Sequence, residues 1–313
     1  MEFVAAWLAL AAFLGFAFAP FSTAVKRLTK RAGDWTVALL LLPYLLAVGF
    51  QPGAEALLRF VLYLALPTLV LRFRPRDAKP FDLFQVVAVL LIWVPLETDL
   101  FALGLQLITT PGLDLGGSFS APDLLPSVEA TLLPGVDLPI HTLTGVMLAL
   151  FLFLVRYPLQ GIGYTFRLGL RDLRVALGGL LGFSVVGLPL GLATGFLRFN
   201  PSSPGVVDVI VGIVGGYLLV ALIEEILFRG VIQNLLSERL QRWGWATLIA
   251  AIIFGLAHLN NSTAGFPKPN WAYALMATLA GLAYGWVWRR TRKVTASAIT
   301  HALVNLVWGL LFP

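Results

Sequence analysis

Long, uninterrupted apolar segments are the feature that most restricts what this chain can fold into. Windows of roughly 17 to 25 apolar residues, the length that crosses a bilayer, recur along the whole sequence. Apolar residues make up 58% of the 313 residues, charged residues 12%, and the mean hydropathy is +0.87. A soluble domain cannot bury that much apolar surface. The bilayer must therefore be the solvent, which requires helices or a closed barrel.

The apolar segments are continuous rather than alternating, which argues against a barrel. We therefore predict an all-α polytopic membrane protein with about ten transmembrane helices. The predicted spans are residues 3–24, 35–51, 55–73, 82–108, 141–156, 173–197, 206–236, 245–260, 270–288 and 295–312.

The distribution of Lys and Arg agrees with this number of spans, because cytoplasmic loops are enriched in basic residues. Basic clusters follow the first, third, fifth, seventh and ninth spans, and the other side holds little beyond Arg198 and Lys268. The alternation predicts that both termini lie outside. It also explains the net charge of +6 without a nucleic-acid partner. The tryptophan-rich, cysteine-free composition favours a prokaryotic plasma (inner) membrane.

Residues 109–140 are the one sizeable stretch outside the predicted spans. Repeated Pro, Gly and Ser residues argue against a folded domain there. We expect a partly ordered external loop.

The seventh predicted span contains charged residues, which are costly inside a membrane and need a partner or a purpose. Glu224 and Glu225 are adjacent, and Arg229 follows one helical turn later. Glu225 and Arg229 share a face at i,i+4 spacing, which predicts a structural ion pair. Glu224 is turned about 100° away and is predicted to be the working carboxylate.

Two later spans contain further polar residues. His258 lies near the end of the eighth span, and His301 and Asn305 share one face of the tenth. Any one of them alone would be explained by hydrogen bonding between helices. A rise of about 1.5 Å per residue places all three, with Glu224, near mid-membrane. We therefore expect the four side chains to converge.

One free carboxylate, two imidazoles and a carboxamide are suited to hydrolysis by an activated water. Glu224 would take a proton from the water, with His258 orienting that water or sharing the proton. His301 and Asn305 would donate hydrogen bonds to the oxyanion of the tetrahedral intermediate. This chemistry requires no covalent intermediate, no cofactor and no metal.

The polar residues form three motifs: Glu224-Glu225-x-x-x-Arg229, Phe254-x-x-x-His258 and His301-x-x-x-Asn305. In this order and spacing the chain resembles the CPBP intramembrane protease family, which joins type II CAAX prenyl endopeptidases and bacteriocin-processing proteins. The resemblance covers roughly residues 205–313. It implies that the water is activated by Glu224 and His258, and that the oxyanion hole is formed by His301 and Asn305. Glu225, Arg229 and Phe254 would be structural supports.

The resemblance further implies a glutamic-type endopeptidase whose helical-bundle core holds a cavity reached from the membrane and the cytoplasmic side. The substrate would be a membrane-embedded or lipid-anchored protein, or a leader peptide. Prenylated substrates belong to eukaryotic members, and nothing here indicates one. We divide the chain into an accessory transmembrane region of about five spans, residues 1–172, and a CPBP-like catalytic core, residues 173–313.

Two other interpretations remain open. His258, His301 and one glutamate could form a His₂Glu zinc site, although no His-Glu-x-x-His motif is present. A non-proteolytic scaffold, immunity protein or transporter could use the same buried groups as a proton relay.

Overall fold

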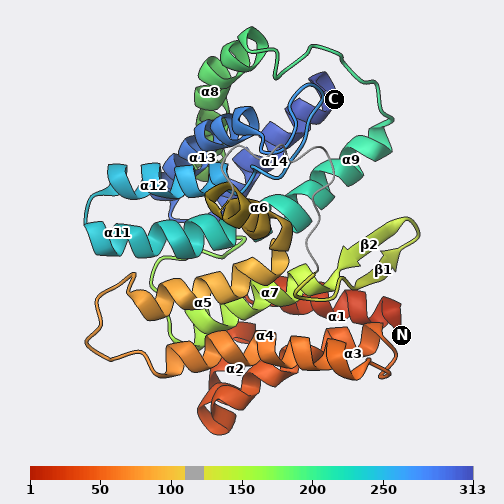
Figure 1. Cartoon of the computed structure of the whole chain (residues 1–313), viewed down its shortest axis with the longest axis vertical. Helices are drawn as coiled ribbons and strands as arrows, with labels where there is room; N and C mark the ends of the chain where they lie inside the picture. The colour runs from red at the N-terminus through yellow and green to blue at the C-terminus, as the bar shows by residue number, and fades with distance from the viewer. Residues whose placement is uncertain (110–122, 313) are drawn as a thin grey trace. The chain divides into compact units, whose positions relative to one another are not determined.

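The computed structural model describes residues 1–109 and 123–312. The chain forms two compact units, one of residues 1–101 and 121–160 and the other of residues 102–120 and 161–313. Both consist mainly of helices (Figure 1). This agrees with the expected all-α membrane class.

The first unit contains most of the short elements. They are α1 (Glu2–Gly15), α2 (Ala19–Ala32), η1 (Gly33–Leu41), α3 (Leu42–Ala47), α4 (Ala54–Arg72), α5 (Leu83–Trp93), η2 (Val94–Leu96), the start of α6 (Thr98–Thr109), β1 (Glu129–Leu133), β2 (Val136–Pro139), α7 (Ile140–Leu150) and η3 (Phe151–Arg156).

The predicted spans 3–24 and 82–108 are bent rather than continuous. The chain turns by 96° between α1 and the segment Ala19–Ala47, which begins with α2, and by 104° between the α5–η2 segment and α6. Pro20 and Pro95 lie at these breaks, where a proline lacks the N–H that continues a helix. The break also leaves the basic residues on α2, outside the apolar helix α1.

The number of long apolar helices falls short of the predicted ten. Within the described residues, four helices are long and apolar enough to cross a membrane, or six if each bent pair is one span. The other expected spans are short, as in α7–η3 and α12 (Trp243–Leu256), or rich in Trp, Tyr and Gly, as in α13 (Trp271–Thr291). The count of ten is therefore not confirmed.

A β-hairpin forms within the stretch that was expected to be a loop. β1 and β2 pair antiparallel, with Ala130 opposite Leu138. Gly135 takes a φ of +79° in the turn, a conformation that glycine adopts readily. The end of the predicted loop is thus ordered, whereas residues 110–122 lie outside the described residues.

The second unit carries all the polar motifs. It comprises most of α6, then α8 (Leu170–Ala193), one long helix Val206–Leu240, α12, α13 and α14 (Val294–Leu311). The long helix consists of α9 (Val206–Gly215), η4 (Gly216–Ala221), α10 (Leu222–Glu225), η5 (Ile226–Gln233) and α11 (Asn234–Leu240), of which η4 and η5 are π-helical.

A buried glutamine joins three of these helices. Gln233 Nε2 donates to Thr247 Oγ1 of α12 at 3.0 Å and to the carbonyl of Gly285 of α13 at 3.2 Å. A Cβ at Gly285 would lie 2.6 Å from Gln233 Oε1. Glycine at this position leaves room for the glutamine side chain, and small residues at such contacts are common between membrane helices.

An irregular segment, residues 161–169, which we call the strap, fixes the start of α14. Gly163 O accepts a hydrogen bond from Val294 N at 3.1 Å, and Thr165 O accepts one from Thr295 Oγ1 at 2.6 Å. Lys293 Nζ reaches Asp172 at 2.7 Å. The strap therefore anchors the end of the helix that carries His301.

Candidate active site

Glu225 and Arg229 form a fully buried pair within the second unit. Arg229 Nε lies 3.2 Å from Glu225 Oε2, so the predicted i,i+4 ion pair is present. The guanidinium carbon lies 4.7 Å from the ring centre of Phe254 and 5.7 Å from that of Tyr284. Its three nitrogens have no aligned hydrogen-bond acceptor among the described residues. The cation is therefore held by one carboxylate and two aromatic faces.

Both glutamates lie on the short turn α10, between the π-helical stretches η4 and η5. Such π turns are rare and are found often at functional sites. They change the direction in which later side chains point, relative to a regular α-helix. The turn itself stays α-helical, so Glu224 and Glu225 face different neighbours.

His301 contacts both glutamates. Its Nδ1 lies 3.2 Å from Glu225 Oε1, and its Nε2 lies 3.9 Å from Glu224 Oε2. The ring stacks on Tyr284 with centroids 4.5 Å apart and an interplanar angle of 14°. A carboxylate paired with Arg229 can only accept, so Nδ1 donates to Glu225. The second nitrogen then faces Glu224.

Glu224 differs from its neighbour in exposure and in partners. Its side chain is 29% exposed, whereas that of Glu225 is 0% exposed. Glu224 Oε2 is buried and accepts no hydrogen bond from the described residues. The carboxylate is therefore available to another molecule.

His258, near the end of α12, presents its second nitrogen as a base. Its Nδ1 lies 2.8 Å from the carbonyl oxygen of Phe254. A carbonyl only accepts, so Nδ1 carries the proton and Nε2 keeps its lone pair in the neutral ring. The ring lies between Phe254, at 4.7 Å, and Tyr273, at 5.2 Å between ring centres.

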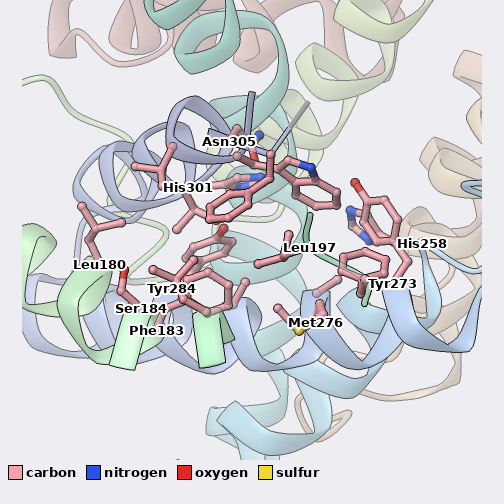
Figure 2. Close-up of a pocket in the computed structure, with 18 of the residues that line it drawn as sticks. Leu180, Phe183, Ser184, Leu197, His258, Tyr273, Met276, Tyr284, His301 and Asn305 are labelled. Atoms are coloured by element: carbon pink, nitrogen blue, oxygen red, sulfur yellow. The ribbon is translucent and has the colours of Figure 1, made fainter. Parts of the chain in front are cut away.

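A pocket with a volume of about 50 Å³ lies between His258 and His301 (Figure 2). His301 and Tyr284 lie side by side, and His258 and Tyr273 lie across the pocket from them. Asn305 also lines the pocket, and its side chain is exposed. The volume holds a few water molecules. Most of the remaining wall is apolar, including Leu180, Phe183, Leu197, Met276 and Trp308.

The seven residues singled out in the sequence therefore gather in two overlapping groups. Direct contacts link Glu224, Glu225, Arg229, Phe254 and His301, and the pocket joins His301 to His258 and Asn305. Glu224 is not among the residues that line the pocket.

Sequence reasoning missed Ser297, Tyr273 and Tyr284. Ser297 Oγ lies 2.5 Å from Glu225 Oε2. Its place one helical turn before His301 is the signal that could have found it. The two tyrosines lie on α13, which carries none of the three motifs.

The zinc interpretation has no geometric support. In residues 1–109 and 123–312, no three His, Cys, Asp or Glu side chains meet at a spacing that could hold a metal ion. His258 lies between the rings of Phe254 and Tyr273, and its Nδ1 donates to the Phe254 carbonyl.

Comparison with known proteins supports the family suggested by the motifs. Residues 206–307 match the family model described as type II CAAX prenyl endopeptidase Rce1-like. The match begins with α9, ends within α14 and includes every motif residue. No curated protein and no solved structure gives a significant match. Through this region, about a third of the chain, the protein is similar to the type II CAAX prenyl endopeptidases, which supports the CPBP intramembrane protease family.

Proposed function

We propose that this protein is an intramembrane endopeptidase in which Glu224 and His258 activate a water molecule. The observation that carries the proposal is the contrast between the two glutamates. Glu225 is surrounded by Arg229, Ser297 and His301, whereas Glu224 Oε2 has no hydrogen-bond partner among the described residues. Glu224 is thus the carboxylate that can accept a proton from water.

The proposed reaction proceeds by direct attack of water on the peptide carbonyl. Glu224 takes one proton from the water, aided by the bare Nε2 of His258, and the oxygen bonds to the carbonyl carbon. The oxyanion accepts hydrogen bonds from His301 Nε2–H and from the Asn305 carboxamide. The carbon–nitrogen bond then breaks, and the proton held by Glu224 or His258 passes to the leaving amine.

The oxyanion role sets a condition on His301. Because Nδ1 already donates to Glu225, Nε2 can donate only when the ring carries both protons. Glu225 lies at Nδ1 of this ring and Glu224 on the side of Nε2.

The substrate we propose is a membrane-embedded or lipid-anchored protein, or a leader peptide. The apolar wall of the pocket supports this choice, because it suits an apolar segment beside the scissile bond. We further propose the plasma (inner) membrane of a prokaryote as the location, with both termini outside. Residues 173–313 contain every residue of the proposed site, and residues 1–172 would be an accessory region.

Comparative membrane proteomics of cells with wild-type protein and with Glu224→Gln tests the proposal. We expect at least one uncleaved precursor to accumulate in the variant. Asp208→Asn is the matched control, because this carboxylate lies on the same long helix but caps its exposed end. An unchanged set of cleavage products with Glu224→Gln would favour a non-proteolytic scaffold, immunity protein or transporter.

A further inference from the structure

Ser297 makes an unusual contact for a hydroxyl in a helix. Serine and threonine in helices often donate to the carbonyl one turn earlier, as Thr247 does to Trp243 O and Thr278 to Ala274 O. Ser297 is fully buried and reaches across to another helix, where its Oγ lies 2.5 Å from Glu225 Oε2. Such a length is typical of a hydroxyl donating to a charged carboxylate.

The other polar contact of Ser297 is to a backbone carbonyl. Its Oγ lies 2.8 Å from Tyr284 O. A hydroxyl has a single proton, and both neighbours accept, so only one of them receives it at a time. The shorter contact and the negative charge favour Glu225.

The two oxygens of Glu225 have different partners. Oε2 receives Ser297 and lies beside Arg229, whereas Oε1 faces His301 Nδ1 at 3.2 Å. Because Ser297 and Arg229 both hold Oε2, the carboxylate of Glu225 cannot rotate freely. Its second oxygen is therefore kept on the imidazole.

His301 is restrained on three sides as a result. Glu225 holds Nδ1, Tyr284 stacks on the ring face, and Phe254 meets the ring edge-on at 5.7 Å and 90°. The restraint leaves Nε2 directed at Glu224. Ser297 itself does not line the pocket, so any effect on the reaction must pass through Glu225.

We propose that Ser297 is a positioning residue, which fixes Glu225 and thereby holds His301 with Nδ1 protonated and Nε2 turned to the reacting groups. The catalytic part of this inference rests on the proposed function. The structural part concerns only the order Ser297, Glu225, His301 and can be measured without turnover.

Nitrogen-15 NMR of the histidine rings tests the structural part, because the chain has only three histidines. His301 is assigned by comparison with His301→Ala. We expect a protonated, hydrogen-bonded Nδ1 in the wild type and a clear change of that signal in Ser297→Ala. Thr300→Val is the matched control, because Thr300 is equally buried on the same helix but donates to Ala176 O. An unchanged His301 signal in Ser297→Ala would overturn the proposal.

Cleavage kinetics on the precursor identified with Glu224→Gln test the catalytic part. Per folded protein, Ser297→Ala should lower kcat about tenfold, the scale of one lost hydrogen bond, with KM unchanged. Thr300→Val should leave both constants unchanged. In a Glu225→Gln background, Ser297→Ala should add no further loss, since both changes act on one chain of contacts.

The possible results separate the two proposals. A changed His301 signal in Ser297→Ala, with no precursor accumulating in Glu224→Gln membranes, would contradict the proposed function but support the positioning role of Ser297. If Ser297→Ala and Glu225→Gln lowered kcat independently and additively, the positioning role of Ser297 would be contradicted, whereas the proposed protease function would stand. An equal fall in kcat with Thr300→Val would also count against Ser297, because it would show a general disturbance of α14.

Discussion

Arg229 shows how much a single side chain supports at the residue scale. It is fully buried, pairs with one carboxylate and lies against the rings of Phe254 and Tyr284. Those rings in turn contact His258 and His301. The arginine is therefore the counter-charge of Glu225, and it also packs against the two rings that contact the histidines.

Removing this cation should destabilise the protein. Arg229→Ala strands the buried charge of Glu225, which typically costs about 3–5 kcal/mol. We expect a low yield of folded protein and a lower midpoint of thermal unfolding in detergent. Arg229→Lys should recover part of the loss, since it restores the charge but not the planar stacking group. A wild-type yield with Arg229→Ala would show that the ion pair has little structural importance.

Asn305 should behave in the opposite way, because its side chain is exposed and the fold does not depend on it. If it donates to the oxyanion, Asn305→Ala should lower kcat by roughly 10²–10³-fold without changing the unfolding midpoint. Asn305→Asp keeps the shape but presents a negative acceptor, so it should be at least as inactive. Substantial activity in the Asp variant would exclude the donor role.

The residues of this site could be found from sequence to unequal degrees. Glu224, Arg229 and His258 interrupt apolar spans where charged or basic groups are costly, so each attracts notice. Ser297 does not, because hydroxyls satisfy themselves inside membrane helices and are common there. Its significance depends on the distance to Glu225, across 72 residues of chain, which no local pattern reports.

At the scale of elements, glycine makes the contact between the strap and α14 possible. Gly163 has a φ of +73°, and a Cβ there would overlap the backbone carbonyl of Arg292. This carbonyl lies just before the residues that start α14. The strap thus follows the turn between α13 and α14 at backbone distance.

A pair of glycines separates conformational strain from steric overlap. Gly195 has nearly the same φ, +72°, but an added Cβ there meets no atom within 4 Å. Gly195→Ala should cost about 1–2 kcal/mol, the usual penalty of the left-handed region. Gly163→Ala should cost clearly more and also lower cleavage activity, because the start of α14 must shift. Thermal unfolding of both variants measures the difference, and equal losses would contradict the overlap.

Average hydropathy predicts apolar helices, but it does not report bends or changes of helix type within them. Spans 55–73 and 295–312 agree closely with α4 and α14, since each is a single unbroken helix with a high average hydropathy. Apolar character continues through Pro20 and Pro95, so the bends there left no trace in the window averages. The π-helical stretches η4 and η5 lie on either side of Glu224 and Glu225, and average hydropathy does not distinguish a π-helical turn from an α-helical one.

At the scale of the whole molecule, the orientation in the membrane depends on the first element. α1 has 14 residues, or about 21 Å at 1.5 Å per residue, which is shorter than a hydrocarbon core of about 30 Å. The basic helix α2 follows after the 96° bend. Whether the N-terminus lies outside therefore depends on how α1 and the bend are accommodated.

The absence of cysteine makes this orientation measurable with single introduced thiols. We expect Arg76→Cys and Arg239→Cys to react with an impermeant reagent only from the cytoplasmic side. Glu2→Cys and Ser203→Cys should react from the outer side. The unmodified chain is the blank. Labelling of Glu2→Cys from the cytoplasm would place the N-terminus inside and show that the α1–α2 segment does not cross.

The size of the pocket has a consequence for the order of events. About 50 Å³ accommodates a few waters, and most of the wall around this space is apolar. We therefore expect the hydrolytic water to be a resident reagent, with the peptide entering only when the apolar wall opens. The protein would then select its substrates when a peptide enters the pocket, before any bond is broken. A segment that cannot part the wall would go uncut whatever its sequence at the cleavage point.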